Sequence, residues 1–276
     1  MAYRLLAMDL DGTVLNSEKV IAPRTEQAIR AAIRSGKDVF FASGRGPSEM
    51  RRYLAQFPEM RYAIGLSGAA VFDLQRGESL ASVTLPRTLA EEILAASREL
   101  DAMLVIFAGP EVYVERKQRG HLAHFGCDCF AALYDDCAVW VEDMADVLNR
   151  DGERIYKMNL YCHTEKEWRK AGEKLGHLPV SFAQGIPNNY EISPQGVDKG
   201  AGLKLLCRTL GLPVEETIAV GDEGNDVAML RAAGLGVAMA NASPEAKAAA
   251  DELTADCDHD GVADVIEKYL LTGETI

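Results

Sequence analysis

The chain has 276 residues, of which 48% are hydrophobic and 26% are charged, and its formal net charge is -13. This length is sufficient for one large domain or two modest ones, and the composition is typical of a soluble globular protein. The acidic charge excludes general affinity for nucleic acid or an anionic membrane surface, because no basic field attracts phosphate polymers. The apolar run after Arg4 is too short for a signal peptide and no stretch reaches the length of a membrane span, so we expect a cytoplasmic protein.

The cysteines do not indicate a disulfide framework. All six are scattered along the chain, so we expect free thiols. One segment, containing His121, His124, Cys127 and Cys129, places four potential zinc ligands within nine residues. Because structural zinc sites combine two separated ligand pairs, we favour buried thiols and surface histidines here and keep a zinc site as the alternative.

The first part of the chain alternates strands and helices. Apolar runs predict strands at 3–8, 38–42 and 62–66. Pro23 begins a predicted helix that ends before Gly36, and a second helix is predicted over 47–57. This alternation predicts a parallel sheet with right-handed crossovers.

The pattern changes after residue 70. Runs at 71–73 and 79–85 flank a turn and predict a β-hairpin. The block at 85–188 then mixes helices and strands, which predicts a separate α+β unit. It is expected to interrupt a first domain formed by 1–84 and 189–276.

From residue 190 the α/β alternation resumes. We predict strands at 190–192, 217–220 and 235–238. Helices are predicted at 199–209, after Asp226 through Met229 and Leu230, from Pro244, and at 262–271. The predicted fold class is therefore α/β: a doubly wound, Rossmann-like parallel sheet with an inserted α+β cap domain.

Chemically active side chains follow the predicted strands. They are Asp9 and Asp11, then Ser43-Gly44-Arg45, then Lys199 at a helix start, then Asp222 and Asp226. In parallel strands all these ends lie at one edge of the sheet. Carboxylates gathered there would repel by roughly 4 kcal/mol per pair at ~4 Å and an effective dielectric of ~20, so a cation is required among them. Oxygen-only ligands favour Mg²⁺, although the Asp-x-Asp and Asp-Gly pairs taken alone are equally compatible with ordinary turns.

Together these residues resemble the haloacid dehalogenase superfamily of phosphohydrolases over nearly the whole chain. The four matching motifs are Asp9-Leu10-Asp11-Gly12-Thr13, Ser43-Gly44-Arg45, Lys199, and Gly221-Asp222-Glu223-Gly224-Asn225-Asp226. The inserted block is similar to the cap of the Cof-type (IIB) sugar phosphatases. Two residues depart from that subgroup, Ser67 and Cys257, each standing where an Asn is common.

The resemblance implies a role for each matching residue. Asp9 is the expected nucleophile, Asp11 the acid and base, and Lys199 the third catalytic residue. The expected ligands of Mg²⁺ are the Asp9 side chain, the Asp11 backbone carbonyl and Asp222, with Asp226 supporting directly or through water. The expected phosphate- or substrate-binding residues are Gly12, Thr13, Ser43, Gly44, Arg45 and Asn225. For Asn225 we favour substrate contact over helix capping, and for Arg45 substrate contact and a surface ion pair stay open.

The function implied is a Mg²⁺-dependent phosphatase of small phosphorylated metabolites, with sugar phosphates expected first, acting through an aspartyl-phosphate. A cap that closes over the leaving group would exclude water. Two alternatives remain: a phosphomutase of hexose phosphates, and a non-catalytic regulator that binds sugar phosphates. The expected partner is the small metabolite, with no nucleic acid and no membrane, and the chain is expected to be a monomer or weak homodimer.

Overall fold

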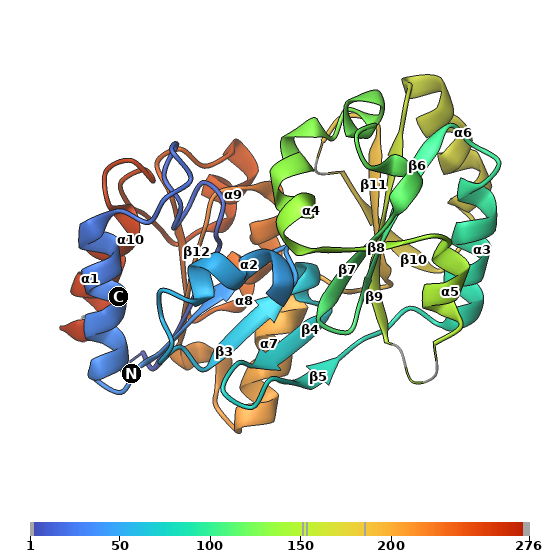
Figure 1. Cartoon of the computed structure of the whole chain (residues 1–276). Helices are drawn as coiled ribbons and strands as arrows, with labels where there is room; N and C mark the ends of the chain where they lie inside the picture. The colour runs from blue at the N-terminus through green and yellow to red at the C-terminus, as the bar shows by residue number, and fades with distance from the viewer. Residues whose placement is uncertain (1–2, 151, 153, 185, 273–276) are drawn as a thin grey trace. The chain divides into compact units, whose positions relative to one another are not determined.

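The computed structural model describes residues 3–150, 152, 154–184 and 186–272. These residues form two compact units, which are treated separately below (Figure 1). The core unit comprises the described parts of Met1–Arg45, Arg52–Ser82 and Asp198–Ile276. The cap unit comprises the described parts of Gly46–Arg51 and Val83–Val197.

The core unit is built on a sheet whose strands, among the described residues, run in the order β14-β13-β12-β1-β2-β3-β4-β5. Neighbours are parallel from β14 to β3, and β4 and β5 are added antiparallel at one edge. The strands are β1 (Leu5–Met8), β2 (Asp38–Ala42), β3 (Tyr62–Gly65), β4 (Ala70–Asp73), β5 (Glu78–Ser82), β12 (Thr217–Gly221), β13 (Leu235–Ala238) and β14 (Glu252–Leu253).

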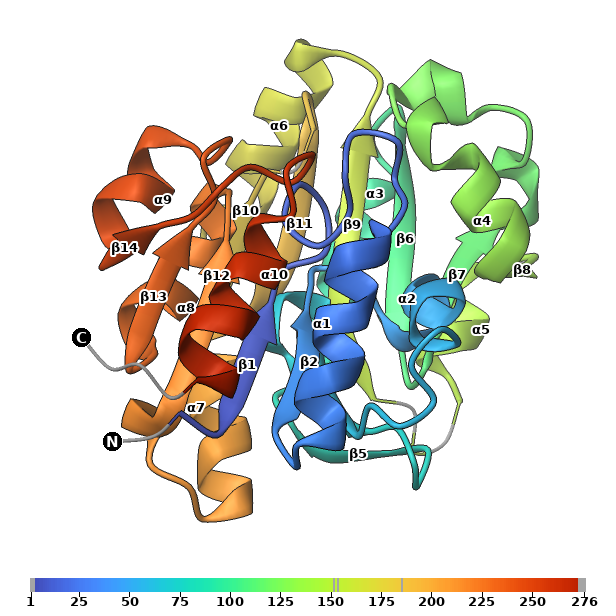
Figure 2. The ribbon, with the colours of Figure 1, turned by 90° about the vertical axis from the view of Figure 1, so that its left-hand side faces the viewer.

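Helices cover both faces of this sheet, which explains why β1 is apolar throughout and fully buried. Figures 1 and 2 show α1 and α10 side by side on one face, with α7 and α8 on the other. The pairing of α1 with α10 is supported by a 3.0 Å hydrogen bond from the Thr25 hydroxyl to Asp260. The helices are α1 (Pro23–Arg34), α7 (Lys199–Leu210), α8 (Val227–Ala232), α9 (Pro244–Ala249) and α10 (Gly261–Val265), which continues as a π-helical turn over Ile266–Leu271; α2 (Pro47–Leu54) crosses the boundary between the units.

The cap unit has a second sheet, whose described strands run in the order β10-β11-β9-β6-β7-β8. All neighbours are antiparallel except β7 and β8. The strands are β6 (Ala102–Ala108), β7 (Glu111–Glu115), β8 (Ala138–Val141), β9 (Ile155–Cys162), β10 (Val180–Ala183) and β11 (Asn189–Pro194). The helices are α3 (Arg87–Ser97), α4 (Ala131–Cys137), α5 (Met144–Leu148) and α6 (Glu165–Leu175).

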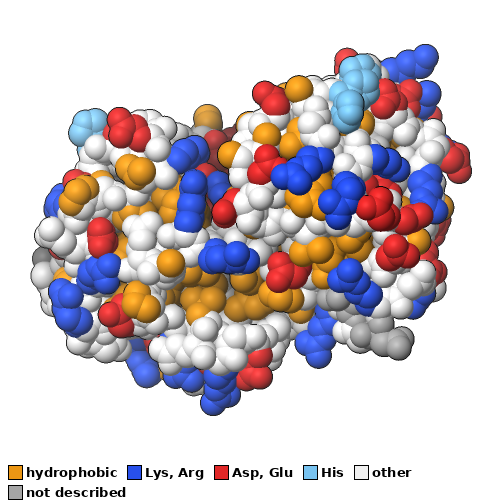
Figure 3. All heavy atoms as spheres, in the orientation of Figure 1, with side chains coloured by type: hydrophobic (Ala, Val, Ile, Leu, Met, Phe, Trp, Pro, Cys, Tyr) orange, Lys and Arg blue, Asp and Glu red, His pale blue; other side chains and the backbone are white. Residues whose placement is uncertain are grey.

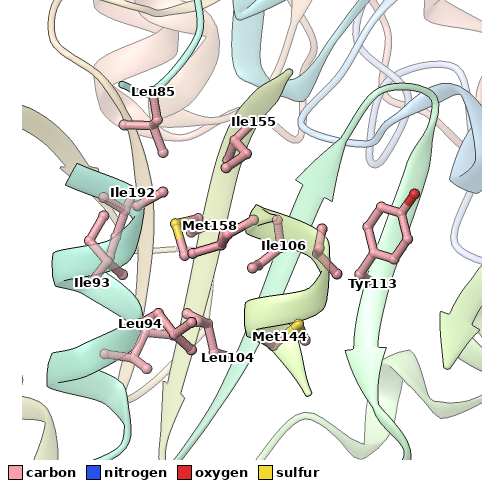
Figure 4. Packing of buried hydrophobic residues seen from close by; sticks show 14 of the residues in the cluster. Leu85, Ile93, Leu94, Leu104, Ile106, Tyr113, Met144, Ile155, Met158 and Ile192 are labelled. Atoms are coloured by element: carbon pink, nitrogen blue, oxygen red, sulfur yellow. The ribbon is translucent and has the colours of Figure 1, made fainter. Parts of the chain in front are cut away.

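The cap unit has its own hydrophobic core. Figure 4 shows Ile93 and Leu94 of α3 packed toward Leu104 and Ile106 of β6, with Met158 of β9 among them. All five side chains are buried. Burying a side chain of this size contributes about 1.5–3 kcal/mol, so this cluster explains why the inserted block forms a compact unit.

Most elements match the sequence-based prediction, but one strand was assigned to the wrong sheet. The strand predicted at 190–192 was expected to resume the parallel core sheet. Instead, β11 pairs antiparallel with β9 and β10 of the cap sheet. The cap unit therefore extends to Val197 rather than to the predicted residue 188, and it begins slightly earlier than predicted, at Val83. A short apolar run predicts a strand but does not specify its partner.

Other boundaries differ by a few residues. The helix predicted over 47–57 ends at Leu54, and the second strand of the predicted hairpin ends at Ser82 rather than at residue 85. No helix within the described residues is long and apolar enough to cross a membrane. On the face shown in Figure 3, acidic and basic side chains are interspersed.

Candidate active site

The candidate site is at the carboxyl ends of β1 and β12, two neighbouring parallel strands of the core unit. The Asp9 amide donates a 2.9 Å hydrogen bond to the carbonyl of Val220 in β12. This bond continues the pairing of the two strands by one residue and places Asp9 at the end of β1. Asp222 follows the last residue of β12 directly. Ligand sites of open α/β sheets lie at this edge.

Lys199 lies between two of the carboxylates. It is the first residue of α7, a helix whose N-terminus is capped by the Asp198 side chain accepting from the Ala201 amide. The Lys199 ammonium donates to Asp9 Oδ1 and to Asp226 Oδ1, each at 2.6 Å. Lys199 has only 1% of its surface exposed. Such charge-assisted bonds between buried groups fix the position of both carboxylates.

Asp226 and Thr13 hold the loop after β12. The second oxygen of Asp226 accepts from the backbone amides of Asp222 and Glu223, each at 3.0 Å. Thr13 donates from its hydroxyl to Asp222 Oδ1 at 2.7 Å. Because Asp226 already accepts hydrogen bonds at both oxygens, its geometry favours a supporting role over direct metal coordination. Its part in metal binding, like that of the other predicted ligands, stays a prediction.

The electrostatics of the cluster favour an added cation. Burial raises the pKa of Asp9 to about 7, although the Lys199 ammonium opposes this shift. Burial also raises the pKa of Asp222 to about 6, against the Thr13 hydrogen bond. Burial alone would lower the pKa of Lys199, but Asp9 and Asp226 outweigh it and raise that pKa. One ammonium thus compensates for three carboxylates incompletely.

The residues present fit a magnesium ion. Oxygen atoms of Asp9, Asp222 and Asp226 lie within 4.8 Å of one another, and all three residues are buried. Mg²⁺ prefers oxygen ligands and is commonly held by one or two carboxylates, with the remaining positions left for water and substrate phosphate. The donor set is therefore suited to a hard divalent cation.

Position 12 requires glycine because the Asp222 carboxylate packs directly against its backbone. The φ of Gly12 is +81°, and a Cβ at this position would lie 2.3 Å from Asp222 Oδ2. Any side chain here would therefore displace a predicted metal ligand. Asn241 also supports the loop, donating to the Gly12 carbonyl at 2.8 Å.

We expect Gly12→Ala to weaken Mg²⁺ binding and to lower the free energy of unfolding by about 1–3 kcal/mol through backbone strain. Gly36→Ala is a matched control, because Gly36 has the same φ of +81° and nothing within 4 Å of the added Cβ. Denaturant unfolding and magnesium titration of both variants test this. Equal magnesium affinities in the two variants would contradict the role assigned to Gly12.

Asp11 is oriented differently from Asp9. Its carboxylate accepts two hydrogen bonds from Arg45, from Nε and Nη2, each at 2.9 Å, and pairs with Lys19 at 3.1 Å. Burial alone would raise the pKa of Asp11, but Arg45 and Lys19 outweigh it and lower that pKa. In this arrangement Asp11 is a carboxylate, and Arg45 forms the ion pair that was one of its two expected roles.

The remaining predicted residues are less closely tied to the cluster. Ser43 is buried after β2 and its Oγ accepts from the Arg45 amide at 3.2 Å. Gly44 is half-buried in the same loop, and the Asn225 side chain is exposed. The phosphate-binding roles expected for these residues stay predictions.

Among the described residues, Lys19 and Asn241 contact the site through their side chains and were not identified from the sequence. Lys19 pairs with Asp11, and Asn241 lies 3.5 Å from Asp222 Oδ2 as well as bonding to Gly12. Asn241 follows the end of β13 by three residues, so the strand-end argument applied to the other motifs could have found it. The sequence carries no comparable signal for Lys19, which lies in an irregular loop.

The four-residue zinc cluster considered from the sequence is not assembled. Cys127 is buried and its thiol donates to the Leu122 carbonyl at 3.3 Å, while Cys129 is exposed. Among the described residues, the groups able to hold a metal are Asp9 with Asp222 and Asp226, and Asp101 with His124 and His163. Of the four residues considered, His124 alone belongs to such a group. All six cysteines are free thiols, as expected.

The comparisons with known proteins agree with this geometry. The model of the haloacid dehalogenase-like hydrolase family matches residues 6–266. Phosphatase YwpJ of Bacillus subtilis (strain 168) is 30% identical over 294 residues, covering 97% of this chain and 100% of the relative. The HMP-PP phosphatase of Serratia proteamaculans (strain 568) is 27% identical, covering 97% of this chain and 96% of that protein.

A solved structure supports the subgroup. The subclass IIB sugar phosphatase BT4131 superposes with a TM-score of 0.77 at 25% identity, covering 96% of this chain and 98% of that one. The matches extend over both the core unit and the inserted cap unit. The chain therefore belongs to the haloacid dehalogenase-like hydrolases, and within them it is a phosphatase of the Cof-type subclass IIB.

Proposed function

We propose that this phosphatase is Mg²⁺-dependent and hydrolyses small phosphorylated metabolites, sugar phosphates first, through a phosphoryl group carried on Asp9. The observation that carries the proposal is the buried carboxylate cluster: Asp9 held by Lys199 at 2.6 Å, with oxygens of Asp222 and Asp226 within 4.8 Å. The relatives support the substrate class, since one is named a sugar phosphatase and another an HMP-PP phosphatase.

Asp9 is the nucleophile in this proposal. One of its oxygens accepts from Lys199, and the other is free of that bond to attack phosphorus as the ester oxygen departs. Carboxylate nucleophiles of this kind divide one difficult displacement into two easier steps. Magnesium, when bound by Asp9, the Asp11 carbonyl and Asp222, would offset the charge that builds on the transferring group.

Asp11 transfers the proton in both the formation and the hydrolysis of the phosphorylated intermediate. Its pairing with Arg45 controls when it can be protonated. The two hydrogen bonds from Arg45 keep Asp11 deprotonated, so Asp11 must exchange that partner before it can donate a proton to the leaving alkoxide. A phosphate ester offers Arg45 a competing anion that matches its planar donor pair. Substrate entry would therefore release Asp11 for acid catalysis.

The test of this function is release of inorganic phosphate from a panel of phosphorylated sugars, nucleotides and vitamin phosphates. We expect hydrolysis with Mg²⁺, and a rate at least roughly 10³-fold lower after chelation, because a bound metal supplies several kcal/mol of charge stabilisation. Added Mg²⁺ should restore the rate. Asp222→Asn should raise the magnesium concentration needed for half-maximal activity.

Three outcomes would contradict the proposal. Full hydrolysis in chelator would remove the metal from the mechanism. Conversion of a hexose 1-phosphate to the 6-phosphate without phosphate release would identify a mutase, which uses the same aspartyl chemistry but returns the phosphoryl group to the sugar. Binding of sugar phosphates without turnover would indicate a regulator.

A further inference from the structure

A second group of metal-ligating side chains lies in the cap unit, apart from the carboxylate cluster of the core unit. Asp101 directly precedes β6, His163 directly follows β9, and His124 lies in the short helical turn Leu122–Phe125. All three residues are exposed, and histidine side chains are visible on the surface in Figure 3. The phosphatase mechanism does not use this group.

The three side chains converge. His124 Nε2 lies 3.1 Å and 3.0 Å from the two carboxylate oxygens of Asp101. The rings of His124 and His163 are stacked, with centroids 3.8 Å apart and planes 2° from parallel. One carboxylate oxygen and one nitrogen from each ring all lie within 4.8 Å of one another.

Backbone pairing holds two of the three positions. Asp101 and His163 flank the paired residues Ala102 and Cys162 of β6 and β9, and the His163 amide donates to the Asp101 carbonyl at 3.0 Å. The separation of Asp101 and His163 is thus set by the central strands of the cap sheet. Exposed side chains attached to a rigid backbone can adjust by rotation without disturbing the fold.

The His163 ring is oriented by a hydrogen bond to a backbone carbonyl. Its Nδ1 lies 2.6 Å from the carbonyl oxygen of His124. A carbonyl only accepts, so Nδ1 carries the hydrogen, and in the neutral ring Nε2 keeps its lone pair. Metal-binding histidines are typically oriented in this way, with the second nitrogen bonded to a carbonyl or carboxylate.

We propose that the cap unit binds Zn²⁺, or a divalent transition metal of similar preference, through Asp101, His124 and His163. Two imidazoles and a carboxylate with a fourth position for water form a common zinc donor set, unlike the oxygen-only cluster of the core unit. The three ligand atoms lie within 4.8 Å of one another, but zinc bonds of about 2.0–2.2 Å in tetrahedral geometry require them to be closer. Zinc binding therefore requires the exposed side chains to rotate toward one another. The ion replaces the hydrogen on His124 Nε2, and that ring then carries its hydrogen on Nδ1.

The expected consequence is a crosslink within the cap unit. His124 belongs to the short helical turn Leu122–Phe125, whereas Asp101 and His163 flank neighbouring strands, so a bound ion would join this turn to the sheet. A ligand that binds the folded state alone raises the melting temperature with its concentration. The site therefore predicts zinc-dependent stabilisation independent of phosphatase turnover.

The experiment is a zinc titration of the full chain in competition with a chromophoric chelator. Excess Mg²⁺ and the substitution Asp222→Asn suppress zinc binding to the carboxylate cluster. We expect one equivalent of zinc with a dissociation constant of roughly 1 μM or tighter. Affinity should fall roughly 100-fold or more in His124→Gln and His163→Gln, because each removes a direct ligand. The rise in melting temperature with zinc should be lost in the same variants.

The controls are His121→Gln and Cys129→Ser, two exposed residues of the same segment that lie outside the group. Both should bind zinc like the parent and show the same thermal shift. Unchanged affinity in His163→Gln would overturn the proposal. Equal loss in His121→Gln or Cys129→Ser would also overturn it, since it would assign the zinc to the ligands clustered in sequence. Binding weaker than roughly 1 mM in the parent would do the same.

Discussion

Asp9→Asn is expected to abolish phosphate release, with kcat lower by roughly 10⁴-fold or more, as for removal of other enzymatic nucleophiles. The amide has the same shape as the carboxylate but cannot form the phosphorylated intermediate. The fold should remain intact. The folded-state pKa of Asp9 lies at about 7, above its ordinary value, so at pH 8 the ionised carboxylate lowers the stability of the metal-free fold, and Asn removes that charge.

Asp38→Asn is the matched control for this variant. Asp38 is also an acid in the core sheet whose pKa is raised by burial, but it pairs with Leu5 at the beginning of β1, away from Asp9. Its substitution should leave kcat within about twofold of the parent, because Asp38 lies at the end of the sheet opposite to Asp9 and substitutions far from a preformed site rarely alter it. Steady-state kinetics and denaturant unfolding of both variants are the measurements. An Asp9→Asn protein that hydrolyses as fast as the parent would show that the nucleophile is another residue.

Lys199→Met is expected to damage both stability and catalysis. Lys199 is 1% exposed and pairs with Asp9 and Asp226 at 2.6 Å each. Removing one partner of a buried ion pair leaves uncompensated charge and costs about 3–5 kcal/mol of unfolding free energy. Loss of a preorganised donor beside the reacting phosphoryl group should lower kcat by a further factor of roughly 10²–10³.

Lys204→Met provides the comparison on the same helix, because Lys204 is exposed on α7. It should change the unfolding free energy by no more than about 0.5 kcal/mol and leave kcat unchanged. Urea unfolding with and without Mg²⁺ measures the loss of stability, which bound magnesium should partly offset by replacing the lost positive charge. Steady-state kinetics measures the loss of kcat. If Lys199→Met were as stable and active as Lys204→Met, the buried ion pairs would have no role in holding the site.

The arrangement of these residues is the reason for expecting large effects in both Asp9→Asn and Lys199→Met. Asp9, Asp222 and Asp226 come from two strand ends and one helical turn, and Lys199 comes from a helix that begins beside them. The site is thus assembled at the ends of regular elements, and side-chain hydrogen bonds fix the loop that carries Asp222. Preorganised charges of this kind are worth more than the same groups in water, because no reorganisation is needed during the reaction.

Much of the core unit could be predicted from the sequence, because its signals are local. Apolar runs of four to six residues predicted β1, β2, β12 and β13 to within two residues at each end. The rule that parallel strands place their carboxyl ends at one edge then brought Asp9, Lys199 and Asp222 into one predicted cluster. The structure does bring these three residues together, and their catalytic roles remain predictions for the experiments above.

Other features depended on partners that the local sequence does not specify. The strand predicted at Tyr190-Glu191-Ile192 forms as β11 but pairs in the cap sheet, because strand backbones can pair with any neighbour of suitable register. Likewise, His124 was grouped with the cysteines beside it, but its side chain bonds to Asp101, 23 residues earlier. Proximity in sequence was a poor guide in a segment without regular periodicity.

By itself, the sequence determined the α/β class, the inserted cap and the strand-end motifs, because hydrophobic periodicity and turn residues act over a few positions. Only the tertiary structure decided that Arg45 pairs with Asp11, that Asn241 supports Gly12, and that Asp101, His124 and His163 converge. These contacts join residues 23 to 229 positions apart. Their geometry follows from the packing of whole elements, which a pattern read along the chain does not contain.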